Sequence, residues 1–185
     1  MDGKKFLDAD TSMFPVPPVM VSCCSKDGKK NNIITLAWVG ILSSDPPMVG
    51  ICIRPSRFSY GLIEETGDFV VNIPSEDQAR SVDYCGMVTG KANDKFKECG
   101  LTAGKSSKVA APLIQECPVG LECKLVKVVK DYSKSHHLFL GEIVAVAVND
   151  NPGKIDIGKI KPLAFCHGEY WGLGKPVGRM GFSKK

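Results

Sequence analysis

The chain has 185 residues, of which 43% are hydrophobic and 24% charged. That balance fits a single globular domain over residues 1–185 and excludes a disordered or collagen-like chain. Its 24 Lys and Arg against 20 Asp and Glu give a formal charge of +4. This charge is too weak, and arginine too scarce, to indicate a nucleic-acid binder.

The first half of the chain predicts short strands joined by tight turns. A helix is expected over residues 56–66, with Ser56 or Ser59 as its cap and Gly67 ending it. The pair Asp27-Gly28 is a strong turn signal between the first two strands. Runs rich in apolar and β-branched residues predict strands over residues 19–24, 32–40, 48–53 and 69–73.

The second half predicts two further helices and two longer strands. Ser75 and Gln78 have the spacing of a capping box, so a helix should run to about Tyr84. A third short helix is expected over residues 94–99, and strands over residues 121–130 and 138–148. The polar segment over residues 90–112 is the best candidate for a surface excursion. Because helices do not alternate regularly with strands, we expect a mainly β protein, an antiparallel barrel flanked by short helices.

No segment predicts a membrane span or a signal peptide. The longest nearly apolar run, residues 33–42, is too short to cross a bilayer as a helix. The charged first residues are not followed by the apolar core of a signal peptide. We therefore expect a cytoplasmic protein whose eight cysteines are free thiols packed as small apolar side chains. No CxxC pair occurs, so no metal site is predicted.

Two glycine-rich runs resemble nucleotide loops without meeting their requirements. Residues 153–159 have the GxxxxGK spacing, but Ile160 replaces the hydroxyl that would hold magnesium. Residues 172–178 are one residue off the dinucleotide fingerprint, and Pro176 would disrupt the helix that must follow. No GxSxG is present, although composition alone does not exclude a Cys-His enzyme.

The most informative stretch runs from residue 32 to residue 60. A strand ends there in a turn that carries two arginines and two serines and then enters a helix. Such a helix start suits an anion, and a phosphate or a simple helix cap would explain it equally. The polar residues within 32–38 fit either a binding strand or a half-buried strand with one wet face.

Five motifs in a fixed order resemble the flavin reductase-like domain family, in particular its flavoredoxin-type members. The motifs are N-x-x-T-x-x-W, S-S-D-P-P, I-R-P-S-R-x-S-Y, F-V-V-N-I-P and C-G-x-x-T-G-x-x-x-D-K-F, at residues 32–38, 43–47, 53–60, 69–74 and 85–96. The resemblance covers residues 15–175 and implies an FMN-binding split β-barrel. It also implies a homodimer with the flavin near the subunit interface.

The resemblance implies an oxidoreductase that passes electrons from NAD(P)H, or from a redox partner protein, through FMN to an acceptor. A flavin-binding electron carrier without its own NAD(P)H site is the alternative. A barrel that binds an acidic partner through its basic residues would be a third class. No catalytic side chain is predicted, because the flavin carries the chemistry. The implied FMN contacts are Asn32, Thr35, Leu36, Ala37, Trp38, Arg54, Ser56, Arg57, Ser59, Lys95, His137 and Tyr170.

Overall fold

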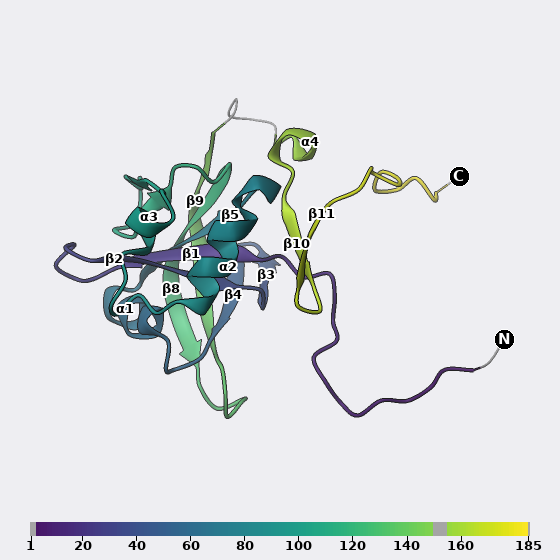
Figure 1. Ribbon diagram of the computed structural model, residues 1–185, viewed down its shortest axis with the longest axis horizontal. Helices are drawn as coiled ribbons and strands as arrows, with labels where there is room; N and C mark the ends of the chain where they lie inside the picture. Colours follow the sequence, from purple (N-terminus) through teal and green to yellow (C-terminus); the bar gives the residue numbers. More distant parts are fainter. Residues whose placement is uncertain (1–2, 150–154, 185) are drawn as a thin grey trace.

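Seven antiparallel strands form the main sheet of the computed structural model, which describes residues 3–149 and 155–184 (Figure 1). From edge to edge the strands are β2 (Asn31–Leu36), β1 (Val19–Cys24), β5 (Asp68–Ile73), β8 (Val119–Val129), β9 (His137–Val148), β4 (Pro47–Ile53) and β3 (Val39–Ser44). Two small ribbons pair β6 (Ala103–Gly104) with β7 (Leu113–Ile114) and β10 (Leu163–Cys166) with β11 (Glu169–Gly172). The predicted mainly β fold is confirmed.

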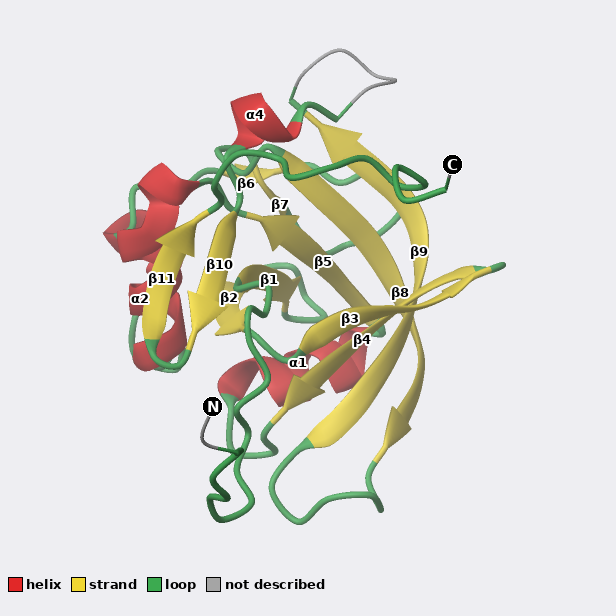
Figure 2. Cartoon of the chain, turned by 90° about the vertical axis from the view of Figure 1, so that its right-hand side faces the viewer, coloured by secondary structure: helices red, strands yellow, loops and turns green. Residues whose placement is uncertain are grey.

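The sheet curls but remains open, because its edge strands β2 and β3 do not pair with each other (Figure 2). These two strands are consecutive in the chain and are joined by a bend at Ala37 and Trp38. The prediction of one continuous strand over residues 32–40 is therefore wrong. The carbonyl of Trp38 accepts a hydrogen bond from the Cys52 N–H at 3.1 Å, which anchors the bend to β4. An apolar run without Gly or Pro at the bend conceals such a break.

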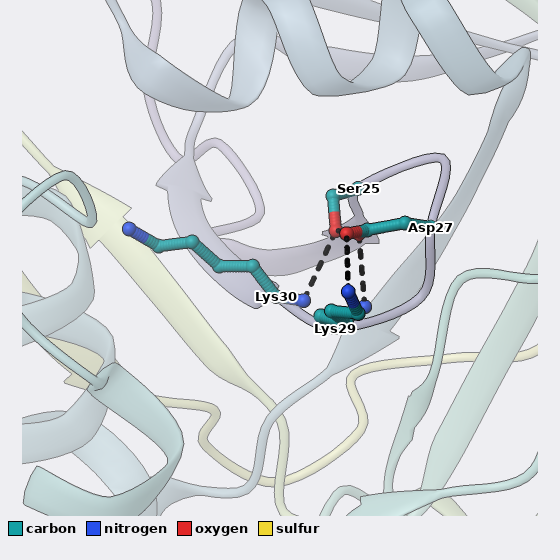
Figure 3. Close-up of polar contacts among 4 residues, drawn as sticks. All are labelled: Ser25, Asp27, Lys29 and Lys30. Atoms are coloured by element: carbon teal, nitrogen blue, oxygen red, sulfur yellow. Dashed lines mark hydrogen bonds and ion pairs between the residues drawn. The ribbon is translucent and has the colours of Figure 1, made fainter.

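The turn between β1 and β2 is the one that Asp27-Gly28 predicts. The Asp27 carboxylate accepts hydrogen bonds from the Ser25 hydroxyl at 2.6 Å and from the Lys29 N–H at 3.1 Å (Figure 3). Gly28 has a φ of 69°, in the left-handed region that glycine adopts without strain. The turn fixes the register that pairs Cys23 with Asn32.

Helix α1 (Phe58–Thr66) begins two residues later than predicted. Arg57 occupies the cap position with no side-chain hydrogen bond, so neither Ser56 nor Ser59 caps the helix. Both serines instead line a cavity at the start of the helix. The predicted stop is confirmed, since Gly67 ends the helix at a φ of 72°.

The remaining helices are short. The predicted capping box forms, with the Ser75 N–H donating to Gln78 Oε1 at 2.9 Å. It opens a 3₁₀ turn (Glu76–Gln78) and then α2 (Ala79–Met87), which continues past the expected end at Tyr84. Helices α3 (Lys95–Glu98) and α4 (Ile157–Ile160) are single turns. No helix in the described ranges is long and apolar enough to cross a membrane.

One of the remaining sequence segments differs in part from the prediction. The segment over residues 90–112 is only partly a surface excursion, because Lys95, Phe96 and Ala111 are buried. Of the first glycine-rich run, residues 153–154 lie outside the described residues, and the end of the run enters α4. The second run leaves β11 as an exposed tail.

Strand β1 lies between two apolar clusters and is buried on both faces. Val19, Val21 and Cys23 point toward α1 and the inner face of the curled sheet. Met20 points the other way, into a cluster that α2 and α3 cover. Helices α2 and α3 cover one of these two faces and also contact β2, where the candidate site forms.

A buried carboxylate holds one loop against the sheet. Glu122, on β8, is only 2% exposed and accepts hydrogen bonds from the Ser107 N–H, the Ser107 hydroxyl and the Lys108 N–H. Its removal would leave these donors without their charged acceptor.

We expect Glu122→Ala to lower the free energy of unfolding by about 3 kcal/mol, because two backbone donors and a hydroxyl lose a charged acceptor. Lys124→Ala is the matched control, since Lys124 lies on the same strand and is exposed. It should change stability by no more than about 0.5 kcal/mol. Chemical denaturation measures both, and equal stabilities would contradict the anchoring role.

Candidate functional site

Two adjoining cavities form a groove between β2, the start of α1 and the end of α2. They share the lining residues Ile34, Arg57 and Gly86. They measure about 180 and 190 Å³, so together they fall within the range of about 300–1,000 Å³ typical of ligand sites. The first is called the α1 cavity below, and the second, which reaches Trp38, the bend cavity.

The α1 cavity is lined by groups that donate hydrogen bonds. Lys95 is 3% exposed, and its ammonium donates to the carbonyls of Ile33 and Cys85, both at 2.7 Å. An ammonium has three hydrogens, so one is left for a ligand in the cavity that Lys95 lines. Ser56, Arg57 and Ser59 line the same cavity. This donor set suits an anion.

The environment of Lys95 disfavours the charged form of its side chain when no ligand is bound. Burial is the main cause that lowers the pKa of Lys95 below its usual value, and the nearby Arg57 charge lowers it further. No carboxylate is among its recorded hydrogen-bond acceptors. An anion bound in the α1 cavity would therefore stabilise the charged form.

Asn32 is the second buried polar group of the α1 cavity. Its Nδ2 donates to Ser59 Oγ at 2.7 Å, which ties β2 to α1. Its Oδ1 is buried and has no hydrogen-bond partner among the described atoms. A Cβ at Gly90 would lie 1.9 Å from this oxygen, so only glycine fits there. A ligand hydroxyl that reached this oxygen would satisfy the buried acceptor.

The bend cavity is more aromatic. It is lined by the backbone stretch from Thr35 to Trp38 together with Arg54 and His136. Trp38 is 44% exposed, and its ring lies 4.6 Å from the His136 ring, centroid to centroid. Arg54 Nε donates to His136 Nε2 at 3.3 Å, which places the proton of a neutral His136 on Nδ1. Burial and the charges of Arg54 and Arg57 lower the pKa of His136, in keeping with a neutral ring.

The Thr35 side chain contacts helix α2, and Thr35 also lines the groove. Its hydroxyl donates to the Val82 carbonyl, so it also fastens β2 to α2. Gly86, opposite Thr35 on α2, leaves room for this close approach. Polar side chains of β2 therefore connect this strand to both helices, Asn32 to α1 and Thr35 to α2.

The structure brings ten of the twelve sequence-predicted residues to the groove and leaves two outside it. His137 hydrogen-bonds the Tyr60 hydroxyl at 2.8 Å and lines neither cavity. Tyr170 also lines neither, and its hydroxyl donates to Asp83 at 3.3 Å on the far side of α2. Those that line the groove are Asn32, Thr35, Leu36, Ala37, Trp38, Arg54, Ser56, Arg57, Ser59 and Lys95.

Sequence reasoning missed His136, Gly86 and Gly90. Adjacent strand residues point to opposite faces, and here it is His136, just before β9, that reaches the groove in place of His137. The two glycines belong to the C-G-x-x-T-G motif, whose pattern alone does not indicate a role for either glycine. Within the described residues, no three His, Cys, Asp or Glu side chains are grouped to hold a metal ion.

Comparison with known proteins places the chain among flavoproteins. The family model described as "Flavin reductase like domain" matches residues 11–174. Flavoredoxin of Desulfovibrio vulgaris (Miyazaki F) superposes with a TM-score of 0.91 at 33% identity, over 99% of this chain and 100% of that one. Flavoredoxin from Methanosarcina acetivorans gives a TM-score of 0.87 at 28% identity, over 98% of both chains. A protein of Archaeoglobus fulgidus is 39% identical over 131 residues, 70% of this chain and 73% of the relative.

We expect Gly90→Ala to lower the free energy of unfolding by about 1–3 kcal/mol, because the new methyl group displaces Asn32 and breaks its hydrogen bond to Ser59. Gly40→Ala is the control, since nothing lies within 4 Å of its added Cβ. Chemical denaturation of Asn32→Ala, of Gly90→Ala and of the double variant Asn32→Ala/Gly90→Ala measures the coupling between the two positions. Strictly additive effects of the two substitutions would refute the clash.

Proposed function

The chain belongs to the flavin reductase-like domain family, and from that premise we propose that it is an FMN-binding flavoprotein oxidoreductase. The observation that carries the proposal is the division of the groove into one end with a buried ammonium and two serines and another end with Trp38 and His136. FMN has the same division, with a phosphate at one end and a flat ring system at the other. No nucleic acid or metal is part of the proposal.

The α1 cavity is the proposed phosphate end. A phosphomonoester carries a charge of about −1.5 to −2 near neutral pH. Arg57 and Lys95 supply positive charge, and the hydroxyls of Ser56 and Ser59 supply hydrogen bonds. The buried Oδ1 of Asn32 would then meet a hydroxyl of the ribityl chain. The residues present therefore fit the cofactor's polar end.

The bend cavity is the proposed ring end. Leu36, Ala37 and Trp38 would give the apolar contact surface, and Arg54 lies beside them. Bound FMN would supply the electron-transfer chemistry, so the protein needs no acid or base among its side chains. The role of the chain's own residues is to orient the ring, exclude water from its buried edge and set the local charge.

We also propose that the protein is a homodimer. Large apolar side chains are exposed on both terminal segments, which leave the body on the same side (Figure 1). The edge strand β3 exposes Ile41 and Leu42, which adds to the uncovered apolar surface. A monomeric mass of the FMN-loaded protein by light scattering would contradict this.

The cytoplasmic location stays a prediction.

The first test compares FMN with riboflavin, which lacks the phosphate. We expect the wild-type protein to bind FMN more tightly than riboflavin at fixed ionic strength, with quenching of Trp38 fluorescence as the readout. Arg57→Gln should weaken FMN binding by about tenfold or more, because it removes a charge-assisted hydrogen bond. Riboflavin binding should change by less than about threefold.

Arg80→Gln is the control for the loss of one positive charge, since Arg80 is exposed on α2 and lines neither cavity. Its FMN affinity should equal that of the wild-type protein. Equal affinities of the wild-type protein for FMN and riboflavin would show that the phosphate is bound elsewhere. Failure to bind either flavin would refute the proposed function.

The electron donor is tested on the FMN-loaded protein without oxygen. We expect NADH or NADPH to bleach the flavin absorbance, as the reductase proposal requires. Bleaching by dithionite alone would favour the electron carrier, which a redox partner protein reduces. The comparison of the two nicotinamides also assigns the donor's identity.

A further inference from the structure

Two thiols meet at the wall of the α1 cavity. Sγ of Cys85, on α2, lies 3.9 Å from Sγ of Cys99, which directly follows α3. Cys85 lines the cavity and is fully buried, whereas Cys99 is partly exposed. The FMN proposal gives neither thiol a role.

Lys95 lies between these two cysteines in sequence and hydrogen-bonds the backbone of each. Its ammonium donates to the carbonyl of Cys85 at 2.7 Å, and its own carbonyl accepts from the N–H of Cys99 at 3.1 Å. The backbones around both thiols are therefore held by the same residue. The two sulfurs are already in contact, and a disulfide bond would require them to approach each other by about 2 Å.

We propose that Cys85 and Cys99 form a reversible disulfide, with a low-molecular-weight disulfide as oxidant. The thiolate of Cys99 attacks one sulfur of the oxidant, forms a mixed disulfide and releases one small thiol. The sulfur of Cys85 then attacks Cys99 Sγ and displaces the second small thiol. Two protein thiols are oxidised, one small disulfide is reduced to two thiols, and the two protons stay with the released thiols.

The difference in exposure sets this order of events. The oxidant reaches Cys99 from solvent, whereas Cys85 is covered. Burial, followed by the neighbouring Cys99, raises the pKa of Cys85 to about 12, which protects this thiol from direct attack. The charge of Lys95 acts in the opposite direction and lowers the pKa of Cys85, which favours the thiolate that the second step requires.

Cys117 is the competing partner. It is buried in the same apolar cluster as Cys85, but its sulfur accepts a hydrogen bond from Gln78 Nε2 at 3.7 Å. It also has little access to solvent, so it does not offer an entry point for the oxidant. The geometry therefore selects Cys99 as the partner of Cys85.

The test treats the reduced full-length protein with oxidised glutathione, followed by alkylation and mass spectrometry. We expect a product lighter by two hydrogen atoms, with two fewer alkylated thiols, that dithiothreitol reverses. Trypsin cuts at Lys91, Lys95 and Lys97, so the two cysteines should appear in separate peptides joined by the disulfide. A linkage of Cys85 to Cys117, or no linkage, would overturn the proposal.

The single variants separate the two roles. Cys85→Ser should retain one glutathione on Cys99, because the resolving thiol is gone. Cys99→Ser should neither form the disulfide nor take up glutathione at Cys85. Cys166→Ser is the control, since Cys166 is also partly exposed and should leave the disulfide yield unchanged. Loss of the disulfide in this control, or uptake of glutathione at Cys85 in Cys99→Ser, would refute the proposal. None of these readouts depends on FMN binding.

Discussion

The buried ammonium of Lys95 is the contact on which the α1 cavity depends. By donating to the carbonyls of Ile33 and Cys85, it joins an edge strand, the end of α2 and the start of α3 around one charge. Placing an ammonium where no carboxylate neutralises it costs folding free energy, and burial lowers its pKa accordingly. A bound anion would offset this cost. The serine hydroxyls and the Arg57 guanidinium that line the same cavity are also groups that bind anions.

The open sheet explains why the groove has two different ends. Within the described residues, edge strand β2 pairs with a strand on one side only, and it also contacts α1, α2 and α3. The chain then bends at Ala37 and Trp38 to begin the opposite edge strand. That bend places the Trp38 ring against His136. The α1 cavity is thus lined by residues at the ends of helices, and the bend cavity is lined by Trp38 and its neighbours in the bend.

The sequence predicted local features well and long-range placement poorly. The Asp27-Gly28 turn, the stop at Gly67 and the capping box at Ser75 all formed, because each depends on neighbouring residues. The bend after β2 was missed, because it depends on the curl of the whole sheet. His136 was missed for His137, because the face that a residue presents shifts with a single step of register. The burial of Lys95 could not be read from its charged surroundings in the sequence, since α2 covers it.

The same contacts tie the thiol pair to the cavity. Residues 85–99 leave α2, pass Gly90 against Asn32 and return through α3, so both ends of the segment carry a cysteine and its middle carries the tight packing. A disulfide across these ends would close the segment into a loop and reduce its freedom chiefly in the unfolded chain. Lys95 lies inside this loop, and its ammonium position would be restricted with it. Thiol oxidation and anion binding would therefore both act on the α2–α3 segment, which lines one side of the α1 cavity.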